Sequence, residues 1–108
     1  MSVNSRIIAA LDLGIPCVPV VYTGAATEYI TFNYATLPDD FGDDAPAHER
    51  YLIQVHYVCP LSTNPIPKQN VIKQKLVAAG FTWPEMTPAG DGTIQHYTFE
   101  CEDAEGVS

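Results

Sequence analysis

Residues 50–60, RYLIQVHYVCP, constrain the fold more than any other stretch, because their apolar and polar side chains alternate. One parity is aromatic or apolar and consists of Tyr51, Ile53, Val55, Tyr57 and Cys59. The other parity includes Arg50, Gln54 and His56. A period of two is typical of a β-strand with one buried face, and Pro60 ends it because proline has no N–H for the sheet. We therefore predict that this segment is the central strand of a small sheet.

Six other segments have a helical period or a strand-like composition. Helices are predicted at residues 3–13 and 68–79, where apolar residues recur every three or four positions. Strands are predicted at residues 17–22, 28–34 and 93–102, and a short one at 81–83 that Pro84 breaks. In the last of the long strands Tyr97, Phe99 and Cys101 are expected to face inward. The order is α-β-β-β-α-β-β, and the short connections favour antiparallel pairing. The predicted fold class is α+β, a two-layer sandwich with two helices on one face of a mostly antiparallel, four- to five-stranded sheet.

The length of 108 residues suits one domain. We expect that domain at residues 1–102, followed by a flexible acidic tail at 103–108. The chain has 13 acidic and 5 basic residues, a net charge of −8 that disfavours nucleic-acid binding. The first residues lack the features of a secretion signal, and no apolar run is long enough for a membrane helix. We expect a soluble cytoplasmic product without a membrane partner.

Residues 35–49, ATLPDDFGDDAPAHE, have no period and predict a long loop between two strands. A candidate interaction loop within it consists of Asp39, Asp40, Phe41, Asp43 and Asp44. Two adjacent acidic pairs do not match the alternating ligands of a calcium loop, so we expect a solvated or docking surface and no metal. Most of the basic residues lie in another segment and form a candidate complementary basic face: Lys68, Lys73 and Lys75.

The histidines and cysteines do not form a recognisable catalytic set. His56 and His96 share the outward parity of strands that are candidate neighbours. As cross-strand partners they are able to bind zinc, but no third ligand is evident, which favours a pair of surface histidines. Cys17, Cys59 and Cys101 are odd in number and widely spaced, which favours buried structural thiols.

A cysteine nucleophile is disfavoured because Cys59 and His56, three residues apart on one strand, lie on opposite faces. The chain also has no glycine-rich phosphate loop and no nucleophile elbow. We therefore expect no enzymatic activity, no cofactor and no small-molecule substrate.

Several short motifs follow one another along the chain in a characteristic order. They are LGIPCVPVVYTG, EYITFNY, an acidic loop ending in DD, YLIQVHYV, VIKQKLVAAGFTW and IQHYTFECE. In order and spacing this series resembles the small tail-terminator proteins, also called tail completion or tail-to-head joining proteins, of long-tailed bacteriophages and prophages. The resemblance covers about residues 6–102.

The resemblance implies a structural role in the virion. Such proteins form a hexameric ring that caps the tail tube, stops its polymerisation and presents a surface to the head-completion protein. The implied partners are copies of the chain itself, the tail-tube protein and the head-completion protein, with double-stranded DNA passing only in transit. Assembly would take place in the bacterial cytoplasm.

Two points stay open at this level. We hypothesise that Asp39, Asp40, Asp43 and Asp44 line the bore and repel DNA phosphates. The alternatives are that the loop contacts the tail-tube protein or is only solvated. The alternative functions are another neck or head-closure component and a small non-viral ligand-binding or regulatory module.

Overall fold

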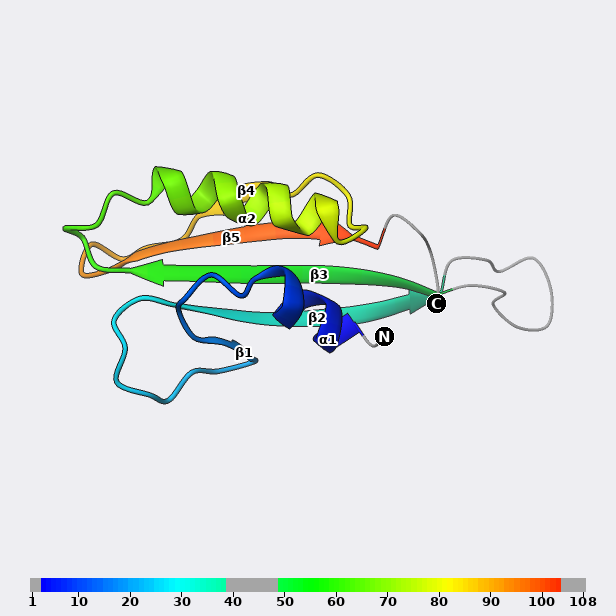
Figure 1. The fold of residues 1–108 in the computed structure, drawn as a ribbon, viewed down its shortest axis with the longest axis horizontal. Helices are drawn as coiled ribbons and strands as arrows, with labels where there is room; N and C mark the ends of the chain where they lie inside the picture. Colours follow the sequence, from blue (N-terminus) through cyan, green and yellow to red (C-terminus); the bar gives the residue numbers. More distant parts are fainter. Residues whose placement is uncertain (1–2, 39–48, 104–108) are drawn as a thin grey trace.

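The computed structural model describes residues 3–38 and 49–103. The elements in chain order are α1 (Val3–Ala10), β1 (Cys17–Pro19), β2 (Tyr29–Pro38), β3 (Glu49–Cys59), α2 (Ile66–Ala78), β4 (Glu85–Pro88) and β5 (Gln95–Glu102). The strands form one five-stranded sheet in the order β1-β2-β3-β5-β4 (Figure 1). Neither helix in the described part of the chain is long and apolar enough to cross a membrane.

Strand β3 occupies the centre of the sheet, as its alternating sequence predicts. It pairs antiparallel with β2 on one side and with β5 on the other. Strand β4 pairs antiparallel with β5, while β1 pairs parallel with β2. The α+β class and the mostly antiparallel sheet are therefore confirmed.

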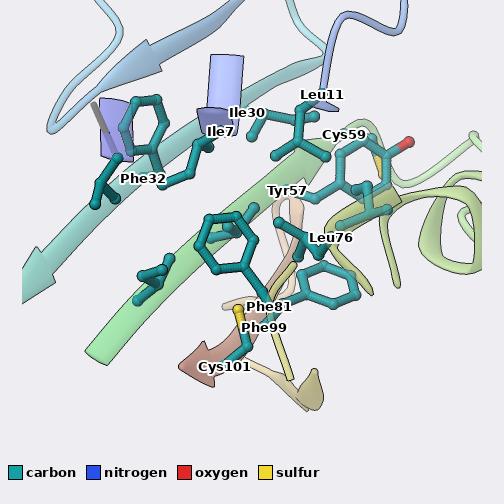
Figure 2. Packing of buried hydrophobic residues seen from close by; sticks show 14 residues of the cluster. Ile7, Leu11, Ile30, Phe32, Tyr57, Cys59, Leu76, Phe81, Phe99 and Cys101 are labelled. Atoms are coloured by element: carbon teal, nitrogen blue, oxygen red, sulfur yellow. The ribbon is translucent and has the colours of Figure 1, made fainter. Parts of the chain in front are cut away.

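The hydrophobic core lies between the two helices and one face of the sheet. Helix α1 contributes Ile7, the turn after it contributes Leu11, and α2 contributes Ile72 and Leu76. The sheet contributes the inward parity of its three inner strands, namely Ile30, Phe32, Ile53, Val55, Tyr57, Cys59, Phe99 and Cys101. Figure 2 shows how these side chains converge. The side chains predicted to face inward on β3 and β5 are thus the ones that pack in the core.

Several predicted helices and strands end at a different residue in the structure. Helix α1 ends at Ala10 and not at residue 13, and Gly14 then adopts a φ of 83°. Strand β1 ends at Pro19 and not at residue 22, because the backbone turns sharply at Val20. Strand β2 runs on to Pro38, beyond the predicted residue 34, because it pairs with β3 along its whole length.

The strand predicted at 81–83 is also wrong, since β4 begins after Pro84. Phe81 makes only an isolated bridge to Asp103 and packs into the core. Strand β5 begins at Gln95, two residues later than predicted. Proline at position 84 thus precedes a strand and does not end one, which is compatible with an edge strand such as β4.

The predicted flexible tail at residues 103–108 is wrong at its first residue, Asp103. Arg6 Nη1 donates to Asp103 Oδ2 at 2.7 Å, and Arg6 Nη2 donates to the Ala79 carbonyl at 2.9 Å. The guanidinium lies 4.6 Å from the centre of the Phe81 ring. The Asp103 side chain is fully buried and that of Arg6 is 12% exposed. Asp103 therefore belongs to the domain, while residues 104–108 lie outside the described part.

Helix α2 ends in a Schellman motif centred on Gly80. The N–H of Phe81 donates to the Leu76 carbonyl at 3.1 Å, and the N–H of Gly80 donates to the Val77 carbonyl at 3.0 Å. Gly80 has a φ of 99°, as expected of a residue that follows the helix.

We predict that Gly80→Ala lowers the free energy of unfolding by about 1–2 kcal/mol, because a Cβ is strained at this φ. Urea denaturation measures the change. Gly80→Asn is the matched control and should cost less, because asparagine tolerates the left-handed region better. Equal losses for both variants would contradict a conformational origin.

Candidate functional site

The sheet face opposite the helices carries a group of polar side chains that contact one another, and we call it the open face. Its members alternate with the core residues along the three inner strands. They include Asn33 from β2, Gln54 and His56 from β3, and His96, Thr98 and Glu100 from β5. The register places His56 opposite Thr98 and Val58 opposite His96, so the two histidines are diagonal neighbours.

A chain of hydrogen bonds crosses the open face from Glu100 to His96. Gln54 Nε2 donates to Glu100 Oε2 at 3.2 Å, and Asn33 Nδ2 donates to Gln54 Oε1 at 3.4 Å. His56 Nε2 lies 3.1 Å from Asn33 Oδ1, and His56 Nδ1 lies 2.9 Å from His96 Nε2. The cross-strand histidine pair expected from parity is therefore confirmed as a contact.

The order of donors and acceptors along this series of hydrogen bonds assigns the proton of each imidazole. The Glu100 carboxylate accepts, which fixes the orientation of the Gln54 amide and then of the Asn33 amide. Asn33 Oδ1 is an acceptor, so His56 carries its proton on Nε2 and has a lone pair on Nδ1. His96 then donates from Nε2. Burial, reinforced by repulsion from His96, lowers the pKa of His56 and favours its neutral form.

An apolar hollow of about 350 Å³ adjoins the histidine pair on the open face. Its apolar lining comes from Val20, Val21, Tyr22, Tyr29, Val58 and Ile94. Val20 and Val21 are 75% and 65% exposed. A second hollow shares Tyr29 and Ile94 and adds the exposed Leu61. Exposed apolar side chains gathered in one place are typical of a contact surface, and we call this region the apolar corner.

The backbone at the apolar corner is strained. Val20 has a φ of 68°, a value that β-branched residues rarely adopt. The N–H of Val21 donates to the Pro19 carbonyl at 2.8 Å, which closes a γ-turn around Val20. The N–H of Val20 donates to the Phe32 carbonyl at 2.8 Å. Such strain costs about 1–3 kcal/mol and is often found at functional positions.

The edge of β2 next to β1 is only partly covered. The three residues of β1 pair with Ile30, Thr31 and Phe32. Beyond Phe32, no described strand pairs with β2 on that side, while β2 and β3 continue together to Pro38 and Glu49. Figure 1 shows this end of the hairpin running past β5 and the helices. An unpaired strand edge is able to accept a further strand.

The predicted site residues fall in different places. The candidate interaction loop, Asp39, Asp40, Phe41, Asp43 and Asp44, lies outside the described residues. Lys68 lies beside Leu13, and Lys75 lies beside Ala9 and Asp12, so both are on the flank of α2 that faces α1 and the segment after it. Lys73 is about 140° around the helix from Lys68. The three lysines therefore do not share one face.

The cysteines lie where a structural role would place them. Cys59 and Cys101 are buried and Cys17 is half-buried. Burial raises the pKa of Cys17 to about 11 and that of Cys101 to about 12, so little of the reactive thiolate is present near neutral pH. Cys59 is in the core and His56 on the open face, as strand geometry predicts.

The sequence prediction missed the apolar corner. The only available signal was the run of apolar residues after Pro19, which breaks the alternation expected of a half-buried strand. Within residues 3–38 and 49–103, no group of three or more His, Cys, Asp or Glu side chains is placed to hold a metal ion.

Comparison with known proteins gives no further identification: no protein-family model and no curated protein matches the chain.

Proposed function

We propose that this chain is a structural subunit of a long-tailed bacteriophage or prophage particle, a tail terminator that caps the tail tube as an oligomeric ring and joins it to the head. The order of the sequence motifs supports this role. The observation that carries it is the apolar corner, where a strained turn exposes Val20 and Val21 beside a hollow. Exposed apolar anchors at the edge of a sheet suit a protein whose function is to contact other proteins.

The proposal also explains the separation of charge along the chain. A closed ring joins two different surfaces of each subunit. The acidic residues at positions 39–44 would supply one surface, and the flank of α2 with Lys68 and Lys75 would supply the other. The unpaired part of β2 adds backbone groups that a neighbouring copy or the tube protein can bind. The ring would be hexameric, as in the proteins that the sequence resembles.

The deciding experiment mixes the purified protein with tail tubes assembled without a terminator. We expect tubes to stop growing and to carry a ring of density at one end, which negative-stain electron microscopy measures as tube length and end structure. Failure to bind any tube end would overturn the proposal. Binding to heads instead of tubes would indicate a head-closure component, and a tightly bound small molecule would indicate a ligand-binding module.

Charge reversal on α2 tests the ring contact. We predict that Lys68→Glu combined with Lys75→Glu weakens capping at least tenfold, because like charges would then meet across the ring contact. Lys73→Glu is the matched control and should weaken capping less, since it lies on another side of the helix. The defect should shrink as salt screens the repulsion. Equal effects of the two changes would contradict the assigned surface.

A further inference from the structure

The His56–His96 pair brings two imidazole nitrogens to hydrogen-bond distance on the open face. His56 Nδ1 and His96 Nε2 are 2.9 Å apart and come from two adjacent strands at the centre of the sheet. Both side chains are half-buried, so their strands and neighbours hold them in place. Imidazole nitrogens are the commonest protein ligands of transition metals.

His56 is already oriented as a metal ligand. Its Nε2–H donates to Asn33 Oδ1 at 3.1 Å, which leaves the lone pair of Nδ1 directed at His96. Histidines that bind metals almost always donate their other N–H to such an oxygen. If the proton of His96 moves from Nε2 to Nδ1 through solvent, both facing nitrogens carry a lone pair, and a small rotation of the two rings turns these lone pairs toward one ion.

The two nitrogens are already close enough to become neighbouring ligands of one ion. Two bonds of about 2.05 Å at 90° place the nitrogens about 2.9 Å apart, whereas a tetrahedral angle places them about 3.3 Å apart. Angles near 90° are typical of the square-planar or tetragonal sites of Ni²⁺ and Cu²⁺. The hydroxyl of Thr98 lies 3.4 Å from His56 Nδ1, the nitrogen that would bind the ion.

We propose that His56 and His96 bind one divalent ion of the nickel and copper class in neighbouring coordination positions, with water in the positions that face solvent. This is a two-ligand site, and it lies on the open face beside the apolar hollow. It does not depend on the proposed role in tail assembly. The bound ion would connect β3 to β5 and so stabilise the centre of the sheet.

The test uses untagged, full-length protein treated with a chelator and then dialysed, with Ni²⁺ as the probe because Cu²⁺ oxidises thiols. Calorimetric titration should give one ion per chain, and the melting temperature should rise with Ni²⁺ concentration. His56→Gln and His96→Gln should each weaken binding at least tenfold. Circular dichroism checks that both variants are folded, as expected for changes on the open face and outside the core.

Two further variants sharpen the test. Asn33→Ala should weaken Ni²⁺ binding about tenfold, because it removes the group that orients His56. His48→Gln changes the third histidine of the chain and should leave binding unchanged. Equal affinity in wild type, His56→Gln and His96→Gln would overturn the site. Tighter binding of Zn²⁺ than of Ni²⁺ would overturn the assignment to the nickel and copper class.

Discussion

Arg6→Ala is expected to lower the free energy of unfolding by about 3–5 kcal/mol, the usual cost of removing one partner of a buried ion pair. The Asp103 carboxylate is fully buried, and the Arg6 guanidinium donates to it at 2.7 Å. The same guanidinium also binds the carbonyl of Ala79 at the end of α2 and stacks on Phe81. One side chain therefore connects α1, the end of α2 and the end of β5.

Urea denaturation with an unchanged m-value is the measurement, since the change should act on the folded state. Lys73→Ala is the control for loss of a cation and should stay within about 0.5 kcal/mol of wild type, as surface changes usually do. Arg6→Met combined with Asp103→Leu should recover much of the loss, because apolar pairs often replace buried ion pairs at little cost. A loss below about 1 kcal/mol for Arg6→Ala would show that the pair is not a structural link.

The periodic parts of the sequence predict the fold well. The alternation of residues 50–60 identified the central strand, and the same rule placed Tyr97, Phe99 and Cys101 on the core side of β5. Parity also placed His56 and His96 on the open face, where they are in contact. These predictions succeed because burial on one side of a strand depends only on local spacing.

The remaining features depend on contacts between distant segments. Arg6 and Asp103 are 97 positions apart, and nothing local distinguishes Asp103 from the nearby acidic residues Glu102 and Glu105. Strand β2 extends past its own apolar pattern because β3 supplies hydrogen-bond partners. Strand β1 stops early because Val20 takes a positive φ, which no residue preference predicts for valine. The apolar corner was missed for that same reason.

Val20→Gly should increase stability and at the same time weaken assembly. Glycine adopts a φ of 68° without strain, and Val20 is 75% exposed, so little burial is lost. Relief of strain stabilises the folded state, and the greater entropy of glycine in the unfolded state offsets part of this gain. The free energy of unfolding should therefore rise by about 1 kcal/mol. If Val20 is a contact residue, capping of tail tubes should weaken about thirtyfold, corresponding to about 2 kcal/mol of binding.

The opposite signs of these two effects make the prediction specific. Val21→Ser should leave stability within about 0.5 kcal/mol, because Val21 is 65% exposed, and it should weaken capping in the same way. Val77→Ala changes an exposed valine on α2 and should affect neither measurement strongly. A stabilised Val20→Gly protein that caps tubes as well as wild type would mean that the strain has no role in assembly. A destabilised one would mean that the turn is held by contacts of the valine itself, and the case for a surface kept strained for binding would then fail.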